Sequence, residues 1–192
     1  RTAGISDVGV VIGYRSARMR QGLWATEPRL TFLHNKDYNA GNAVSLFAAR
    51  PFVMDEPFVL CMGDHAISPA IVQKLMADAR EECTLCVDYK AWHPAQVGDA
   101  TKVMVERDGY ISEIGKQLDF WNAVDTGVFM MTADVFPVIE KLIDLQGPET
   151  TISDLVTHMG ERGQPFATRD VSGMFWADVD TPEDYESVDF LL

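Results

Sequence analysis

Short apolar runs alternate with segments of helical periodicity along most of this sequence. The clearest run, PFVLCM at residues 57–62, is apolar throughout, as expected of a strand covered on both faces. A helix follows it, with Ser68 as the cap and Pro69 at its first position. Alternation of this kind predicts an α/β fold of three layers, in which helices cover both faces of a mostly parallel sheet.

The remaining elements are predicted from the same patterns. Strands are expected at residues 8–14, 30–33, 83–89, 128–131 and 166–169, and helices at residues 16–23, 42–50, 135–145 and 152–159. Asp108-Gly109 lies between two strand-like segments and predicts a β-hairpin. Thr151 and Asp154 have the spacing of a capping box, and Thr181-Pro182 begins a last helix.

Composition restricts the classes of function. With 192 residues, of which 47% are hydrophobic, we expect one domain over residues 1–192. The net charge of −13 argues against binding to DNA or RNA, because a surface of that sign repels phosphate backbones. The sequence contains no apolar stretch long enough to cross a membrane. Three cysteines without a secretory signal fit a cytoplasmic protein.

Cys83 and Cys86 have the CxxC spacing of a zinc site, and His65 and His93 could complete it. However, the segment CTLCVDY has the pattern of a strand, and residues three apart on a strand face opposite sides. Two buried core cysteines are therefore the favoured interpretation.

Acidic residues follow two of the apolar runs. Gly63 and Asp64 come directly after residues 57–62, and Gly63 would leave room for a turn or a ligand. Asp178 and Asp180 follow the apolar segment MFW and would point to the same side of an extended chain. Ligands bind at the carboxyl ends of strands in such sheets, so these acids are candidate Mg²⁺ ligands. Each acid also has a structural interpretation, as a turn former or helix cap.

Joined, the two loops would suit the transfer of a nucleotide to a phosphorylated acceptor. That reaction gathers negative charge, which Mg²⁺ and cationic side chains neutralise, and the attacking phosphate is already ionised. Lys102 and Lys116 are the candidate cations, and both could equally be solvated surface lysines.

Polar groups for the two substrates can also be proposed from the sequence. Asp125, Thr126 and Gly127, before an apolar strand, could bind the hydroxyls of a polyol or sugar, or could simply form a turn. A base or ribose could be recognised at the loop-to-helix junction that contains Gly41, Asn42 and Ser45. Capping of the following helix by Asn42 is the competing interpretation there.

Five segments together resemble the sugar-phosphate nucleotidyltransferase superfamily, of the nucleotide-diphospho-sugar transferase type. They are FVLCMGDH (58–65), ATKVMVE (100–106), ISEIGK (111–116), AVDTGVFMM (123–131) and FWADVDTPED (175–184). GNAVSLFAAR (41–50) is similar to the corresponding loop and helix of the inositol- and choline-phosphate cytidylyltransferases. Among the members, the inositol-1-phosphate cytidylyltransferases look most similar. The resemblance implies a Rossmann-like fold with a mixed, mostly parallel sheet.

The resemblance also implies roles for residues. Asp64 and Asp180 would be the Mg²⁺ ligands, with Asp178 as a close alternative, beside Gly63. Lys102 and Lys116 would meet phosphates, with Lys116 counted in the catalytic set. The remaining roles fall to the candidate base, ribose and polyol contacts: Gly41, Asn42, Ser45, Asp125, Thr126 and Gly127.

The implied reaction joins CMP from CTP to inositol 1-phosphate, giving CDP-inositol and pyrophosphate for inositol phospholipid or related pathways. Members are sometimes fused to a membrane-embedded alcohol phosphatidyltransferase. The rivals are other acceptors, such as a sugar 1-phosphate or phosphocholine. Choline would need an aromatic cage, for which Trp92, Phe120 and Trp121 are available.

One departure from the family pattern stands out. Members begin with a strand and a Gly-rich loop of the GxGTR type, which wraps the triphosphate, and this sequence has no such segment. We therefore expect a chain truncated at its N-terminus, or a relative that binds nucleotides without catalysis.

Overall fold

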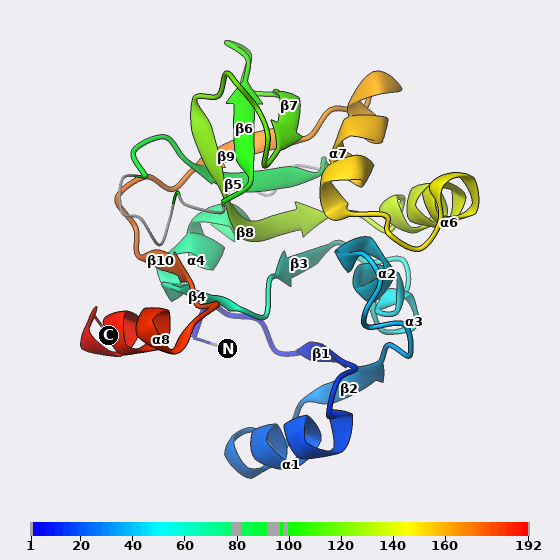
Figure 1. Cartoon of the computed structure of the whole chain (residues 1–192), viewed down its shortest axis with the longest axis vertical. Coiled ribbons are helices and arrows are strands. Elements are labelled where there is room, and N and C mark those ends of the chain that lie inside the picture. The colour runs from blue at the N-terminus through cyan, green and yellow to red at the C-terminus, as the bar shows by residue number, and fades with distance from the viewer. Residues whose placement is uncertain (1, 78–81, 92–96, 98–99, 192) are drawn as a thin grey trace. The chain divides into compact units, whose positions relative to one another are not determined.

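The computed structural model describes residues 2–77, 82–91, 97 and 100–191 (Figure 1). The chain divides into two compact units, Arg1–Pro57 with Thr132–His158, and Phe58–Met131 with Met159–Leu192. The single domain predicted from the sequence stays a prediction beside this division.

The first unit contains a small parallel sheet and several helices. Strands β1 (Gly9–Ile12) and β2 (Thr31–His34) pair in parallel and are joined by α1 (Ser16–Thr26). The short helices α2 (Asn42–Phe47) and α3 (Arg50–Val53) follow, and α2 packs against α6 (Val135–Gln146). The amphipathic pattern of α6 explains its position, because it buries Val135, Phe136, Ile139 and Leu142. Helix α7 (Ile152–Glu161) begins in this unit and ends in the second.

The second unit is built on a six-stranded sheet whose central strand is β8 (Ala123–Met131). Its neighbours are β3 (Phe58–Cys61), β5 (Thr84–Asp88) and β6 (Lys102–Val105), and β7 (Ile111–Gly115) and β9 (Ala167–Asp170) lie farther out. The Asp108-Gly109 hairpin between β6 and β7 is confirmed, with Gly109 at φ +89°. The edge strand near residues 166–169 is confirmed as β9.

The directions of the strands differ from the prediction. In the described sheet, β8 is antiparallel to β3, β5 and β6, and β6 is antiparallel to β7. Only β1–β2 and β5–β9 are parallel among the described pairs. The apolar run at residues 57–62 forms β3, which pairs with β8 and is only part-buried, with Cys61 exposed, so it is less covered than predicted. An apolar run also carries no information on the direction in which the neighbouring strands run. The mixed α/β class was therefore predictable, and the mostly parallel pairing was wrong.

A separate two-stranded ladder completes the second unit. Strands β4 (His65–Ile67) and β10 (Trp176–Asp178) pair in antiparallel fashion. Helix α4 (Pro69–Ala77) follows β4, and α8 (Pro182–Leu191) follows β10. Ser68 caps α4 as predicted, since its hydroxyl accepts a hydrogen bond from the N–H of Ala70. None of the helices in the described part of the chain has the length and apolar character that crossing a bilayer requires.

Candidate metal centre

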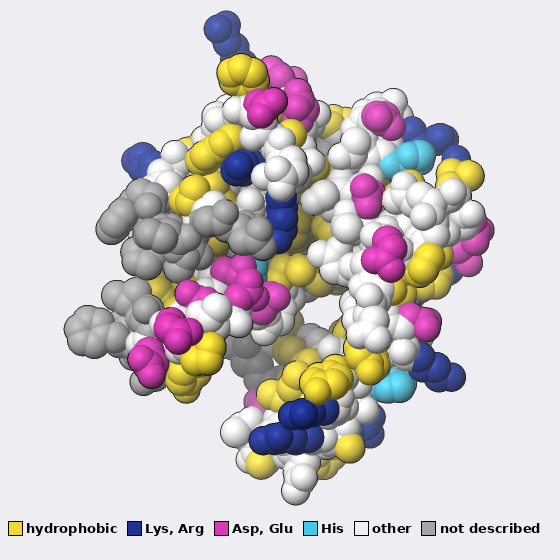
Figure 2. All heavy atoms as spheres, viewed as in Figure 1, with side chains coloured by type: hydrophobic (Ala, Val, Ile, Leu, Met, Phe, Trp, Pro, Cys, Tyr) yellow, Lys and Arg dark blue, Asp and Glu magenta, His cyan; other side chains and the backbone are white. Residues whose placement is uncertain are grey.

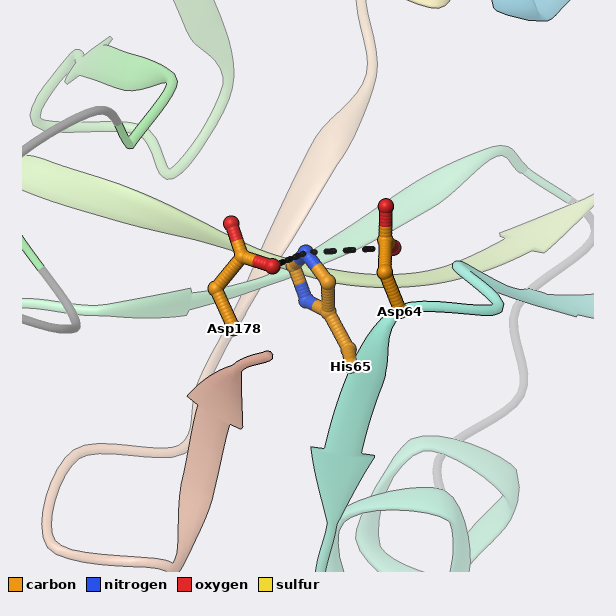
Figure 3. A group of neighbouring side chains, drawn as sticks. All are labelled: Asp64, His65 and Asp178. Carbon is orange, nitrogen blue, oxygen red and sulfur yellow. Dashed lines mark ion pairs between the residues drawn. The ribbon is translucent and has the colours of Figure 1, made fainter. Parts of the chain in front are cut away.

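The β4–β10 ladder brings together two acids and a histidine. Asp178 of β10 lies directly opposite His65 of β4, and the N–H of Val179 donates to the carbonyl oxygen of Asp64 at 2.9 Å. One ligand atom from each of Asp64, His65 and Asp178 lies within 4.8 Å of the others. Figure 3 shows the imidazole between the two carboxylates, with its Nε2 atom 3.9 Å from Oδ1 of Asp64 and 3.9 Å from Oδ1 of Asp178.

The orientation of His65 is fixed from its other ring nitrogen. Nδ1 of His65 lies 2.8 Å from the carbonyl oxygen of Thr126. Because a carbonyl oxygen only accepts hydrogen bonds, Nδ1 must carry the proton in this contact. In the neutral ring the lone pair is then on Nε2, the atom that faces the two carboxylates. This is the tautomer found in metal-binding histidines, whose second nitrogen usually donates to a carbonyl or carboxylate.

An opening in the edge of β8 makes this contact possible. Strand β5 covers one edge of β8 from Val124 to Met130. On the other edge, β6 pairs with Ala123 and Val124, and β3 pairs with residues 128–131. The N–H of Asp125 still donates to the carbonyl oxygen of Thr101 at 2.9 Å, so the gap in the pairing lies between Asp125 and Gly127. The N–H of Met62 donates to the carbonyl oxygen of Gly127 at 3.0 Å, which continues the β3–β8 pairing and brings the loop after β3 to this edge of β8.

Gly127 is required where His65 approaches β8. Its φ is +74°, a value that other residues rarely adopt. A Cβ atom there would collide with the imidazole of His65 and lie 2.9 Å from Cγ of Met62. The glycine therefore serves the approach of His65. Gly63 differs, because a Cβ atom at Gly63 would meet nothing within 4 Å, so the fold itself does not demand a glycine there.

The carboxylate of Asp178 has an unsatisfied atom. Its Oδ1 is buried and accepts no hydrogen bond from the described residues. Burial raises the pKa of Asp178, and the negative charges of Asp180 and Asp64 raise it further, while His65 lowers it. A buried acceptor among like charges is costly unless a cation is present, so the donor set fits a divalent ion.

Asp125 faces the same region from β8. Burial raises its pKa to about 6, although the N–H of Gly127, which donates to Oδ1 at 2.7 Å, and the nearby His65 both favour the ionised form. Thr126 points elsewhere. Its side chain is fully buried, and its hydroxyl donates to the carbonyl oxygen of Cys86. This internal hydrogen bond argues against the polyol contact predicted for Thr126.

The structure reverses the order of preference that the sequence analysis gave to Asp178 and Asp180. Asp180 was preferred as the metal ligand, with Asp178 as the alternative, whereas the structure groups Asp178 with Asp64 and His65. Asp180 is exposed and acts on Asp178 through its charge. Strand β10 ends at Asp178, so only Asp178 is held in register with His65.

The candidate cations lie in the sheet of the same unit. Lys102 pairs with Val124, the residue before Asp125, and with Gly115, which precedes Lys116. Both lysines remain predicted phosphate contacts. Their pairing at least locates Lys102 next to the opening in β8.

The predicted nucleotide residues belong to the first unit, where all three have structural tasks. Oδ1 of Asn42 accepts a hydrogen bond from the N–H of Ile152 at 2.8 Å, so Asn42 caps α7 rather than its own helix. The hydroxyl of Ser45 accepts from the buried Asn35 at 3.0 Å. A Cβ atom on Gly41 would collide with the carbonyl oxygen of Thr150. Their contacts with a nucleotide stay predictions.

Other sequence-based interpretations are resolved in part. Cys83 and Cys86 are buried, as the core interpretation expects, while His93 lies outside the described residues. Of the possible aromatic cage, Phe120 and Trp121 are exposed, and Trp92 lies outside the described residues. The sequence analysis did not place three residues in the cluster: His65, which the structure groups with the two acids, and Asp88 and Trp176, which lie behind it. The sequence signals were the GDH triplet for His65 and the segment at residues 175–184 for Trp176.

Known proteins are similar to this chain over most of its length. The nucleotidyl transferase family matches residues 1–190. A protein of Rubrobacter xylanophilus named bifunctional IPC transferase and DIPP synthase is 31% identical over 186 residues, which are 96% of this chain and 41% of that protein. Its namesake in Aquifex aeolicus is 37% identical over 145 residues, 76% of this chain and 31% of that protein. The chain thus spans less than half the length of either relative.

A solved structure supports the fold. The inositol-1-phosphate CTP transferase of T. maritima superposes with a TM-score of 0.82 and 24% identity, over 98% of this chain and 76% of that one. At that level of identity the likeness concerns the fold, and it confirms the predicted Rossmann-like α/β class.

Proposed function

We propose, since the chain belongs to the nucleotidyl transferase family, that it transfers CMP from CTP to inositol 1-phosphate, with CDP-inositol and pyrophosphate as products. The names of the relatives from Rubrobacter xylanophilus and Aquifex aeolicus support this choice of reaction. The observation that carries the proposal is the convergence of Asp64, His65 and Asp178 on one point.

Asp64, His65 and Asp178 would hold the divalent ion that the family generally uses. The buried Oδ1 of Asp178, which lacks a hydrogen-bond donor among the described residues, supports a cation at this point. We propose Mg²⁺ as the working ion, because carboxylates dominate the set. When bound, the ion would neutralise negative charge on the triphosphate.

The protein's own groups would act by position and charge. The acceptor phosphate is ionised at neutral pH, so no side chain has to remove a proton from it. Lys102, beside the opening in β8, would attract a phosphate, and Lys116 a second one. Asp125 would accept hydrogen bonds from polyol hydroxyls, which favours its ionised form.

The larger context is also a proposal. Both relatives are named bifunctional. This chain matches 41% of the protein from Rubrobacter xylanophilus and 31% of the protein from Aquifex aeolicus. We propose that the full-length protein joins this chain to a membrane-embedded alcohol phosphatidyltransferase that consumes CDP-inositol. The cytoplasmic location expected from the cysteines fits such an arrangement and stays a prediction.

Pyrophosphate release by the full-length protein tests the reaction. CTP, UTP, GTP and ATP are each offered with inositol 1-phosphate, phosphocholine or glucose 1-phosphate, with Mg²⁺ or with EDTA. We expect turnover with CTP and inositol 1-phosphate, and loss of turnover in EDTA. Turnover with a different pair would replace the substrates, and nucleotide binding without any turnover would replace the enzyme with a binding protein.

Single substitutions connect that activity to the cluster. Asp64→Ala and Asp178→Ala should each abolish turnover in Mg²⁺ while the protein stays folded. The matched control is Asp108→Asn in the β6–β7 hairpin, an exposed acid outside the cluster. Full activity in Asp178→Ala would remove that residue from the site and leave Asp180 as the second ligand.

A further inference from the structure

Asp88, the last residue of β5, is a buried acid with both carboxylate oxygens in use. It is 4% exposed. Its Oδ1 accepts a hydrogen bond from the N–H of Lys90 at 2.7 Å, and its Oδ2 accepts one from Nε1 of Trp176 at 2.9 Å. Buried carboxylates are rare and need such partners, and this one connects the main sheet with β10.

Trp176 lies between Asp88 and the proposed metal centre. Its side chain is 2% exposed, and its indole lies nearly parallel to the imidazole of His65, with ring planes at 22° and centroids 6.3 Å apart. Along β10, Trp176 is two residues before Asp178, so both side chains are on the same face of the strand. The Trp176 side chain thus lies beside His65 and fixes the position of β10, the strand that carries Asp178.

The β4–β10 ladder needs such an anchor. Each strand has only three residues, and an isolated two-stranded ladder is marginally stable in water. The β4 side is attached to the sheet by the contact between Nδ1 of His65 and the carbonyl oxygen of Thr126. The β10 side is attached by the hydrogen bond between Trp176 and Asp88.

We propose that Asp88 and Trp176 are positioning residues that hold His65 and Asp178 at the spacing a divalent ion requires. The inference rests on the proposed metal centre and adds Asp88 and Trp176 as the residues that support its ligands. Outer partners of metal ligands typically change metal affinity about 10- to 100-fold when they are removed. Neither residue touches the ion in this scheme.

The test is the affinity of the chain for Mn²⁺, followed by electron paramagnetic resonance at about 150 mM salt, where surface charges are screened. Asp88→Asn leaves one oxygen for two donors, and Trp176→Phe removes the indole N–H while keeping an aromatic ring. We expect each variant to bind Mn²⁺ about 10- to 100-fold more weakly. The double variant should be close to Trp176→Phe alone, because the hydrogen bond between Trp176 and Asp88 is already absent in that single variant.

The controls separate positioning from stability. Asp108→Asn changes an exposed acid that also accepts from the N–H two residues on, and Trp24→Phe changes an exposed tryptophan. Both should leave Mn²⁺ affinity unchanged. Urea unfolding of every variant shows whether the folded fraction is complete in the binding assay. If Asp88→Asn does not fold, Trp176→Phe carries the test.

The outcomes distinguish two failures. Equal Mn²⁺ affinity in wild type and in folded Trp176→Phe, with only the urea midpoint lowered, overturns the positioning role and leaves the metal centre standing. Absence of Mn²⁺ binding in the wild-type chain overturns the metal centre itself, and the positioning role with it.

Discussion

At the scale of single residues, His65 gives the proposed metal centre its chemical character. Two carboxylates alone are a hard oxygen site of the kind that suits Mg²⁺. An imidazole nitrogen added to them shifts preference toward Mn²⁺ and later transition metals. Nε2 of His65 can act in this way because Nδ1 is engaged by the carbonyl oxygen of Thr126.

Substitution of His65 should therefore change metal selectivity. His65→Asn keeps a donor close to the position of Nδ1 and removes the second nitrogen. We expect about a tenfold or larger loss in Mn²⁺ affinity, equivalent to about 1.4 kcal/mol, and a smaller loss in Mg²⁺ affinity. Mn²⁺ resonance and competition by Mg²⁺ measure both. Equal losses for the two ions would mean that His65 positions the carboxylates without binding the ion, and a gain for both ions would mean that it is a cationic partner of the carboxylates.

Asp125 should make stability depend on pH. Its pKa is about 6 in the folded protein, above the usual 3.8 of an aspartate side chain, so the folded state holds the proton more tightly. Stability should then fall as pH rises from about 4 to 6 and stay reduced above that range. Asp125→Asn keeps the acceptor for the N–H of Gly127 and removes the charge. It should raise the free energy of unfolding at about pH 8 by up to about 3 kcal/mol, from roughly two pKa units.

Urea unfolding in EDTA at about pH 8 and about pH 4 checks this sign. The gain from Asp125→Asn should shrink toward the lower pH. A gain that is equal at both pH values would show that the carboxylate is not destabilised by burial. An acid that costs stability at neutral pH is expected at a functional position, which agrees with its proposed contact with the polyol.

The residue scale also shows what the sequence could supply. Asp64 was predictable because it comes soon after the apolar run that forms β3. Asp178 was named only as an alternative to Asp180, because the two acids are two residues apart and equally polar. Only the end of β10 distinguishes them, and that end is set by pairing with β4, whose residues 65–67 are far away in the sequence.

At the scale of elements, the bulge in β8 connects the sheet to the metal centre. Opposite Cys86 of β5, strand β8 has three residues, 126–128, between the pairs Leu85–Phe129 and Val87–Asp125. The extra residues turn the carbonyl oxygen of Thr126 to His65, and Gly127 has the positive φ that this turn needs.

Gly127→Ala should therefore affect both stability and metal binding. The positive φ alone should cost about 1–2 kcal/mol, and the added Cβ atom would displace the ring of His65. Gly109→Ala is a matched control, because Gly109 also has a positive φ but a Cβ atom there meets open space. We expect both variants to lose stability in urea, and only Gly127→Ala to lose Mn²⁺ affinity. Unchanged Mn²⁺ affinity in Gly127→Ala would mean that metal binding by His65 does not depend on the space left by Gly127.

Asn42 offers an element-scale test in the first unit. Its side chain caps the N-terminus of α7 by accepting from Ile152. Loss of such a cap typically costs about 1 kcal/mol, which is expected for Asn42→Ala in urea unfolding. Asn42→Asp keeps the acceptor and should retain stability. If Asn42→Asp remains stable while the full-length enzyme's KM for CTP rises, Asn42 also contacts the nucleotide. If KM stays constant, capping is its whole role.

Elements were predicted with uneven success for a physical reason. Long amphipathic helices such as α6, and strands inside the main sheet, carry enough residues to display their period. Strands β4 and β10 have three residues each and were not predicted. They depend on long-range pairing and on the anchors at Thr126 and Asp88, which no local pattern records.

At the scale of the whole molecule, the net charge of −13 is the dominant long-range property. A charge of that size attracts any divalent cation, whether or not a site exists. Diffuse attraction and specific coordination differ in range, because the Debye length falls from about 30 Å at 0.01 M salt to about 10 Å at 0.1 M. Acidic side chains gather in one patch on the face shown in Figure 2, and other acids are spread over the same face.

Salt should therefore separate the site from its background. Between about 0.01 M and 0.1 M KCl, Mn²⁺ affinity of the wild-type chain should fall as distant acids are screened, then level off at the part due to direct ligands. Asp178→Asn should weaken binding at both concentrations, since its carboxylate is in the cluster. Asp108→Asn should matter at low salt only. If the difference between wild type and Asp178→Asn disappears at the higher concentration, the chain attracts Mn²⁺ by its overall charge, because a coordinating carboxylate keeps its effect at contact distance.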